Sequence, residues 1–264
     1  MSSTAKTLEL LSFFSDSLPE IGLSQMCRLA RRDKATTYRH LQSLVNTGFM
    51  EQNSSNKNYR LGPVLLKLAQ TREATVPRKS GAEAPLRSLA DALGETAHVS
   101  VLSDQELYPI ISCDSSMHST RVIIDVATLP LHATASGLCA LAFGPAKLIE
   151  TASKKLRVYT PSTISTIDDL NAAIDLTRSE GIAIADSSME SDVCSLAAPL
   201  FDQTGLFAGV VSVASVATRF TPDLERSIRQ NLVNASREIT RNWGGAIPTD
   251  LESTWAKSHS LSHV

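Results

Sequence analysis

The spacing of apolar residues at the amino end predicts three helices in succession. Over residues 4–15 apolar side chains recur every three or four positions, as on the buried face of a helix. Ser24 is expected to cap a second helix and Asp33 a third, and Gly48 is expected to end the third. The expected inward stripe of this third helix consists of Tyr38, Leu41, Leu44 and Val45.

Two short apolar runs follow the third helix and predict a pair of strands. Residues 49–51 and 59–61 flank the polar loop 53–58. The order of helix, turn, helix and two-stranded wing is therefore expected here. After Pro63, residues 64–71 predict a linker helix, because proline suits the first turn of a helix. The polar stretch that comes next predicts a domain boundary near residue 76.

The remainder of the chain alternates between strand and helix periodicity. Strands are expected at residues 97–101, 107–113, 121–126, 182–185, 193–201 and 206–216. Helices are expected at residues 85–93, 133–142, 147–153 and 166–180, and from residue 221 onward. The closing stretch is rich in Ser and His and poor in apolar residues, which is typical of a flexible tail.

These elements predict an α+β protein whose larger domain holds a central antiparallel sheet. The domains are expected to be a winged helix-turn-helix over residues 1–62, a linker helix over 63–76, a sheet-containing domain over 77–245 and a flexible tail over 246–264. A chain of 264 residues is long enough for this arrangement.

Charge is distributed unevenly along the chain, although the net charge is only −2. Residues 1–80 contain 12 Lys and Arg against 6 Asp and Glu, whereas residues 81–264 contain 13 against 21. A basic amino-terminal third joined to an acidic remainder is typical of a nucleic-acid-binding module fused to another domain.

The outward face of the third helix carries cations and short hydroxyls, which can contact phosphates and base edges in a major groove. A basic outer face is also common on a merely solvated helix, and the wing together with the charge asymmetry favours DNA binding. The predicted DNA-binding residues are Lys34, Thr36, Thr37, Arg39, His40 and Ser43 on the helix, and Lys57 and Arg60 in the wing.

The chemistry of an enzyme or a metal site is not indicated. The cysteines at 27, 113, 139 and 194 form no CxxC pair, and the chain has no HExxH, GxSxG or Walker motif. Cys194 is interpreted as a packed small residue. We therefore expect no catalytic residue, no metal and no cofactor. Because neither a signal peptide nor a long apolar run is found, a cytoplasmic protein without membrane contact is expected.

Several motifs, in order, resemble the isocitrate lyase regulator (IclR) family of bacterial transcription factors over residues 4 to about 243. They are LSQMCRLARRDKATTYRHLQSLVNTGFME, NYRLGPVLLKLA, ALGETAHVSVL, LPLHATASGLCALAF, TPSTISTIDDLNAAIDLTRSEGIAI and CSLAAPLFDQTGLFAGVVSVAS. The resemblance implies a winged helix-turn-helix and a GAF-like effector-binding domain. It also implies homodimers or dimers of dimers on double-stranded operator DNA. Such regulators repress or activate operons, often catabolic ones, in response to small organic molecules.

The family's effector pocket can be transferred to this sequence position by position. A helix start with free amides suits a carboxylate or carbonyl oxygen, so a carboxylate or an aromatic compound is the expected effector class. The residues that the resemblance implies for the pocket are Ala135, Ser136, Gly137, Ala185, Asp186, Ser195, Ser212 and Ala214.

The sequence departs from the family pattern at several of these places. Leu138 stands where Lys is usual, Ser188 where Glu is common, and Ser195 where Cys is frequent. The pair Ser191-Asp192 replaces Pro-Gly. Together these changes predict a pocket that is more apolar than in many relatives. In the recognition helix, the usual His-Arg order is reversed as Arg39-His40.

Three functions are considered for the whole chain. The leading hypothesis is a ligand-responsive transcription factor, in which the effector changes operator affinity by shifting the dimer between two arrangements. The alternative is an enzyme acting on small molecules with a vestigial DNA-binding arm, which a turnover assay would reveal. A third is a constitutive DNA-bound scaffold, whose operator binding would respond to no metabolite.

Overall fold

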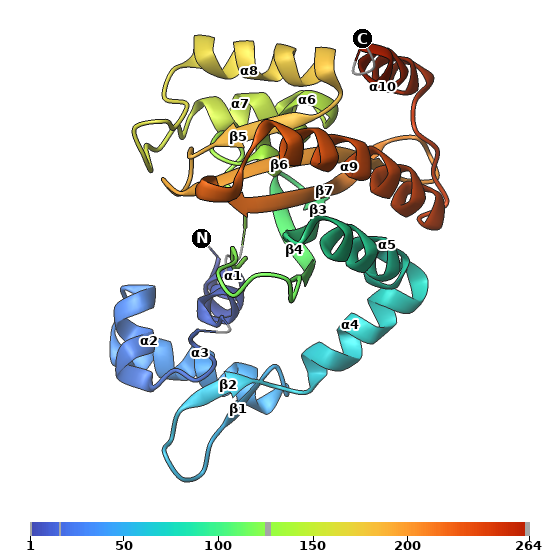
Figure 1. Ribbon diagram of the computed structural model, residues 1–264. Coiled ribbons are helices and arrows are strands. Elements are labelled where there is room, and N and C mark those ends of the chain that lie inside the picture. Colours follow the sequence, from blue (N-terminus) through green and yellow to red (C-terminus); the bar gives the residue numbers. More distant parts are fainter. Residues whose placement is uncertain (1, 16, 125–127, 262–264) are drawn as a thin grey trace. The chain divides into compact units, whose positions relative to one another are not determined.

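The computed structural model describes residues 2–15, 17–124 and 128–261. The chain divides into two compact units, with the boundary between Pro77 and Arg78, and each is described by itself. Figure 1 shows the elements of both units. No helix of the described residues is long and apolar enough to cross a membrane.

The first unit is a small helical core with a two-stranded antiparallel sheet (Figure 1). The elements are α1 (Ser3–Leu8), a 3-10 helix η1 (Glu9–Phe13), α2 (Leu23–Ala30), α3 (Lys34–Asn46), β1 (Met50–Gln52), β2 (Tyr59–Leu61) and α4 (Val64–Thr75). The buried hydrophobic side chains of this unit come from η1, α2, α3, the two strands and the loop before α2, whereas the first and last helices contribute none.

Two helix starts in this unit test the capping predictions. The Asp33 carboxylate accepts a hydrogen bond from the Thr36 amide at 2.8 Å, so the predicted cap of α3 is confirmed. The cap predicted at Ser24 is wrong, because α2 begins earlier, after Gly22, and Ser24 lies inside it. The helix predicted over residues 4–15 is also divided, since α1 ends at Leu8 and continues as the 3-10 helix.

The second unit is built on a five-stranded antiparallel sheet with the order β4-β3-β7-β6-β5 (Figure 1). Its strands are β3 (Thr96–Ser103), β4 (Glu106–Cys113), β5 (Ala183–Asp186), β6 (Val193–Phe201) and β7 (Phe207–Val216). Its helices are α5 (Arg78–Leu93), α6 (Ala135–Phe143), α7 (Lys147–Ser153), α8 (Ile167–Glu180), α9 (Pro222–Asn242) and α10 (Thr249–Leu261), with a 3-10 turn η2 (Ala217–Arg219). The expected α+β architecture with an antiparallel sheet is therefore confirmed.

Each face of this sheet is covered by its own helices. The side chains of Val99, Leu196 and Val211 pack with α5 and α9 on one face. Those of Ala197 and Val210 pack with α6 on the other face, and α7 and α8 lie against α6. Alternate residues of a strand point to opposite faces of the sheet. Because helices cover both faces, both sets of alternating positions in the central strands are buried.

Two of the predicted elements differ from the structure. Residues 121–124 form no strand, and residues 125 and 126 of that predicted strand lie outside the described residues. There the Val122 carbonyl accepts from the Thr96 hydroxyl at 2.8 Å, so a side chain rather than a neighbouring strand pairs it. The flexible tail predicted for residues 246–264 is contradicted by helix α10, in which Leu251 and Trp255 are buried.

Candidate functional site

One face of α3 is exposed and carries positive charge. Lys34, Tyr38 and Arg39 are exposed there, with Tyr38 exposing 47% of its surface. The capping carboxylate of Asp33 holds the start of the helix, and Leu41 and Leu44 anchor its inner face. A rigid helix therefore presents a cation and an aromatic side chain to the surroundings, a combination suited to phosphate and base contacts.

Thr37 was predicted on this outward face, and that prediction is wrong. Its side chain is 0% exposed, and its hydroxyl donates to the Asp33 carbonyl at 2.9 Å. The true inward stripe is Thr37, Leu41 and Leu44, at spacings of four and three. This phase turns Tyr38, which was predicted inward, to the exposed face.

His40 is held against α1 rather than standing free. Its Nδ1 and the Thr7 hydroxyl are hydrogen-bonded at 2.6 Å. Burial lowers the pKa of His40, and the charges of Arg32, Arg39 and Lys6 lower it further. A cleft of about 370 Å³ lies between α1 and α3 and is lined by Ser3, Lys6, Thr7, Thr36, Arg39, His40 and Ser43.

The wing contributes one exposed cation and one paired cation. Lys57 is exposed at a position with a φ of 60° in the loop between β1 and β2. Arg60 donates through Nε and Nη2 to Glu51 at 3.0 and 2.8 Å, so its charge is partly compensated. The loop is tied to the body by Asn56, which donates to the Glu20 carboxylate at 2.9 Å and lowers the pKa of that group.

A second cleft, of about 470 Å³, lies between α2, the start of α3 and the wing. Its lining includes Gln25, Arg28, Tyr38 and Asn56, which the sequence interpretation did not include, beside Lys34 and Lys57, which it did. Arg28 could have been found from its place in the first helix of the helix-turn-helix, since that helix commonly crosses a DNA backbone.

In the second unit, most residues assigned to the effector pocket share one face of the sheet. Ala185, Ser195 and Ala214 stand opposite one another across β5, β6 and β7. Ser212 lies two residues before Ala214, and its hydroxyl donates to the Leu196 carbonyl at 2.7 Å. The first turn of α6, with Ala135, Ser136 and Gly137, packs on this face.

The glycine in that turn is required by the packing around it. A Cβ at Gly137 would collide with the backbone carbonyl of Leu131. The Gly137 amide donates to the Thr134 hydroxyl at 3.0 Å, which caps α6. The helix start thus approaches the preceding loop and the sheet closely.

Asp186 is separated from the other assigned pocket residues. It pairs with Cys194, not with Ser195, and therefore points to the opposite face of the sheet. Hydrogen bonds donated by Cys194, at 3.0 Å, and by Ser187 lower the pKa of its carboxyl. Burial, and then Asp186, raises the pKa of Cys194 to about 12, so this thiol is a poor nucleophile at neutral pH.

His98 on β3 is a residue of this region that the sequence interpretation missed. Its side chain is buried, and its Nε2 is hydrogen-bonded to the Ser136 hydroxyl at 3.2 Å. Burial lowers the pKa of His98 to about 4, so the ring is neutral at physiological pH. The sequence feature that could have revealed it is a row of polar residues that alternates with apolar neighbours, namely Thr96, His98 and Ser100.

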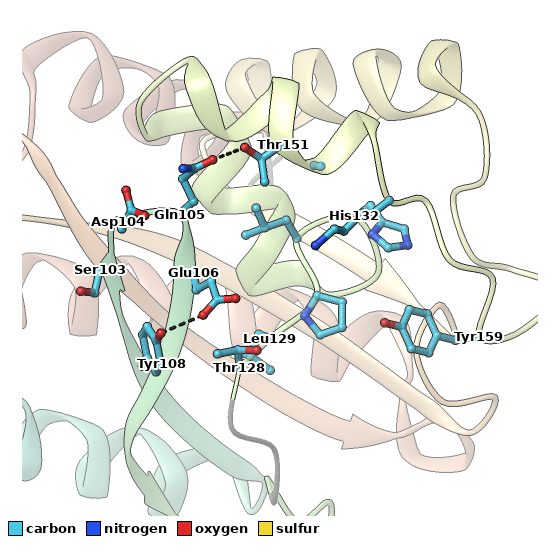
Figure 2. A pocket seen from close by; sticks show the side chains of 14 residues that line it. Ser103, Asp104, Gln105, Glu106, Tyr108, Thr128, Leu129, His132, Thr151 and Tyr159 are labelled. Atoms are coloured by element: carbon cyan, nitrogen blue, oxygen red, sulfur yellow. Dashed lines mark hydrogen bonds between the residues drawn. The ribbon is translucent and has the colours of Figure 1, made fainter. Parts of the chain in front are cut away.

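A separate open cleft of about 540 Å³ lies where the β3–β4 turn meets α7 and the loop before α6, as Figure 2 shows. Within it, Tyr108 donates to Glu106 at 2.8 Å, and Thr151 donates to Gln105. His132 pairs with the Arg157 carbonyl at 2.8 Å. Several of its polar side chains are thus already hydrogen-bonded within the protein. The described residues contain no group of three or more side chains placed to hold a metal ion.

Two family models match the chain. One is described as the IclR helix-turn-helix domain and covers residues 3–54, and the other as the C-terminal part of the bacterial transcriptional regulator IclR and covers residues 77–241.

Individual relatives match along nearly the whole length. The glycerol operon regulatory protein of Streptomyces coelicolor is 27% identical over 239 residues, which are 90% of this chain and 93% of that protein. The transcriptional repressor IclR of Escherichia coli is 25% identical over 248 residues, which are 92% of this chain and 90% of the repressor.

Solved structures show the same architecture. One from Silicibacter sp. TM1040 that carries the IclR regulator name is 36% identical, with a TM-score of 0.84 over 94% of this chain and 99% of that one. An IclR homolog from Microbacterium hydrocarbonoxydans, solved in complex with 4-hydroxybenzoate, is 21% identical, with a TM-score of 0.74 over 91% and 100%. The second likeness concerns the fold alone.

Proposed function

The chain belongs to the IclR family of bacterial transcriptional regulators, and we propose which of its residues contact operator DNA and effector and how its copies assemble. As a member, it is a DNA-binding regulator with a helix-turn-helix domain and an effector-binding C-terminal domain. The reported relatives are named as regulators, which supports the expectation that it is not an enzyme. We also propose that it works in the cytoplasm, where bacterial DNA lies.

The proposed DNA contacts are centred on the exposed face of α3. Lys34, Thr36, Arg39 and Ser43 remain from the sequence prediction, and Tyr38 replaces the buried Thr37. Lys57 and Arg60 are proposed to meet phosphates from the wing. His40 is proposed to hold α3 against α1, because its ring is bonded to Thr7. The exposed cations of α3 are the observation that carries this proposal.

The proposed effector site lies where the first turn of α6 meets the sheet. Ser136 of that turn contacts His98 of β3, Gly137 follows it, and α6 packs on the strands that carry Ser195, Ser212 and Ala214. The Gly137 amide is already used by the Thr134 hydroxyl, but the positive end of the α6 dipole still favours a carboxylate or carbonyl oxygen, which supports a small carboxylate as the effector. An aromatic compound is proposed as the second effector class. Asp186 is proposed to act outside this cluster, because it points to the other face of β5.

Operator binding is the direct test of the regulator function. We expect the full-length protein to bind the DNA upstream of its own gene, and a metabolite handled by neighbouring genes to shift that affinity at least tenfold. Fluorescence anisotropy with labelled DNA measures both effects. Tight binding that no metabolite changes would favour the constitutive scaffold instead. Turnover of a metabolite would favour the enzyme.

We further propose that the protein acts as a homodimer through α4. This helix has no buried residue, and it exposes Leu66 by 70% and Leu68 by 50%. The two leucines lie two apart and therefore on different sides of α4, so their exposure supports a partner that covers more than one side of this helix. A second copy of the chain is the partner that two operator half-sites require.

Replacing Leu66 and Leu68 together with Glu is expected to shift the protein from dimer to monomer at micromolar concentration. Charged side chains would have to be buried at the interface, which is unfavourable. Sedimentation velocity measures the change, and Gln70→Glu on the same helix is the control, since Gln70 is an exposed polar residue. If the double variant sediments like the parent, α4 is not the interface.

A further inference from the structure

We propose that His98 and Ser100 of β3 contact the effector directly, and that the part of the effector they meet is an uncharged hydroxyl or carbonyl group. This inference rests on the proposed effector site and specifies the chemistry of its sheet side.

Both side chains carry a buried polar atom without a partner. His98 exposes 4% of its surface and Ser100 none. Among the described residues, the His98 Nδ1 and the Ser100 Oγ are buried and make no hydrogen bond. An unpaired buried polar group costs stability, so two of them in one row indicate a site that a ligand completes.

Their position on the sheet places them beside the proposed site. Residues 98 and 100 are two apart on β3 and therefore face the same way. His98 stands opposite Ser212 of β7, and its Nε2 contacts Ser136 in the first turn of α6. Both unpaired atoms thus lie on the sheet face that α6 covers, with His98 beside the first turn of that helix.

Other hydroxyls on this face are already used within the protein. The Thr96 hydroxyl donates to the Val122 carbonyl at 2.8 Å, and the Ser212 hydroxyl donates to the Leu196 carbonyl at 2.7 Å. Ser212, which the family resemblance implies as a ligand contact, therefore has no proton left to donate. His98 and Ser100 retain the hydrogen-bonding capacity that a ligand could use.

The chemistry of these groups selects a neutral ligand group. The His98 ring is neutral at physiological pH, so one ring nitrogen donates and the other accepts. A serine hydroxyl can also do either. Among the buried residues of the described chain, Glu95 carries a charge but no Lys or Arg is present. The Glu95 carboxylate accepts from the Arg219 guanidinium at 2.7 and 2.8 Å. No buried cation therefore faces this group, and a hydroxyl or carbonyl suits it better than a second carboxylate.

The test compares two fully buried serines, one on β3 and one in α9, of which only the second has a hydrogen-bond partner. Ser100→Ala removes an unpaired hydroxyl, so the ligand-free Tm is expected to stay or rise. Ser236→Ala in α9 is the control, because the Ser236 hydroxyl is equally buried and donates to the Pro199 carbonyl of β6 at 2.6 Å. Its Tm is expected to fall. A Tm that falls equally in both variants would show that Ser100 is paired and would overturn the proposal.

Ligand binding is measured on the full-length parent, His98→Phe and Ser100→Ala by calorimetry and thermal shift. The probes are matched pairs, namely propionate with lactate and benzoate with 3- and 4-hydroxybenzoate. A hydroxylated probe is expected to bind the parent more tightly than its partner, and each variant is expected to lose about tenfold of that affinity. The probe without the hydroxyl should bind parent and variants alike.

Two further readouts separate contact from indirect effects. In ¹⁵N NMR of histidine-labelled protein, the His98 Nδ1 signal is expected to move when the hydroxylated probe binds the parent. An unmoved signal, equal losses for both members of a pair, or no probe bound by the parent would overturn the proposal. Operator binding is measured in parallel. If a metabolite changes operator affinity while the His98 Nδ1 signal does not move, the regulator function stands and only this inference is overturned.

Discussion

Arg39→Ala is expected to weaken operator binding by about 10- to 100-fold, as the loss of a base or phosphate contact on a recognition helix typically does. Arg39 lies on the exposed face of α3 and, among the described residues, forms no ion pair. Its guanidinium is therefore available to DNA, whereas that of Arg60 is engaged by Glu51. The helix that carries it is fixed by the Asp33 cap and by buried leucines, so the side chain starts from a defined position.

The measurement is fluorescence anisotropy of labelled operator over a range of salt concentrations. Lys57→Ala is the comparison, because a phosphate contact from the wing should reduce the salt slope by about one with little change in sequence preference. Thr37→Ala is the matched control on α3. Thr37 is buried, so this variant should lower the Tm but leave the affinity of the folded protein unchanged. If Arg39→Ala bound like the parent, the proposed DNA-binding face would be wrong.

The sequence prediction placed Tyr38 inward and Thr37 outward on α3, and the structure shows the reverse. Helical periodicity alone could not decide between the two. The stripes 38, 41, 45 and 37, 41, 44 both have helical spacing, and the tyrosine makes the first look more apolar. The structure uses the second, and the Thr37 hydroxyl satisfies itself on the Asp33 carbonyl. A threonine can be buried in this way at little cost, which hydrophobicity does not reveal.

The strand β3 shows a second limit. The five strands of the sheet and helix α8 followed from local periodicity, although a sixth strand was also expected at residues 121–126. The pairing of β3 with β7 did not, because these strands are far apart in sequence. That pairing makes β3 an inner strand with both faces covered. A polar row that alternation alone assigns to solvent is therefore buried under α6 with His98 in it.

The last helix was missed because its tertiary contacts exceed its local signal. Residues 246–264 hold few apolar side chains, and Leu251 and Trp255 are spaced by four. Both pack against the end of α8, where Gly181 has a φ of 71°. A Cβ at Gly181 would lie 2.5 Å from the Trp255 Nε1, so the absence of a side chain there makes room for the indole.

Trp255→Ala is expected to lower the free energy of unfolding by about 3 to 5 kcal/mol, which is typical for removing a buried tryptophan. The indole is 1% exposed, and its Nε1 donates to the Gly181 carbonyl at 3.0 Å. The Arg237 guanidinium lies 5.6 Å from the ring centroid and is bonded to Glu252 at 2.6 Å. The variant thus removes apolar burial, a hydrogen bond and the surface on which Arg237 rests.

Urea unfolding followed by circular dichroism measures this loss. The m-value shows whether α10 unfolds separately, because it would then fall with the surface that the main transition exposes. Trp255→Phe should cost less, because it keeps most of the apolar surface and loses the hydrogen bond to Gly181. Ser253→Ala on the exposed side of α10 is the control and should unfold like the parent. An unchanged midpoint in Trp255→Ala would mean that α10 adds nothing to the second unit. A lower urea midpoint for Trp255→Ala, with an intermediate midpoint for Trp255→Phe, would show that this segment is part of the domain's core. In a flexible tail, all three variants would have the midpoint of the parent.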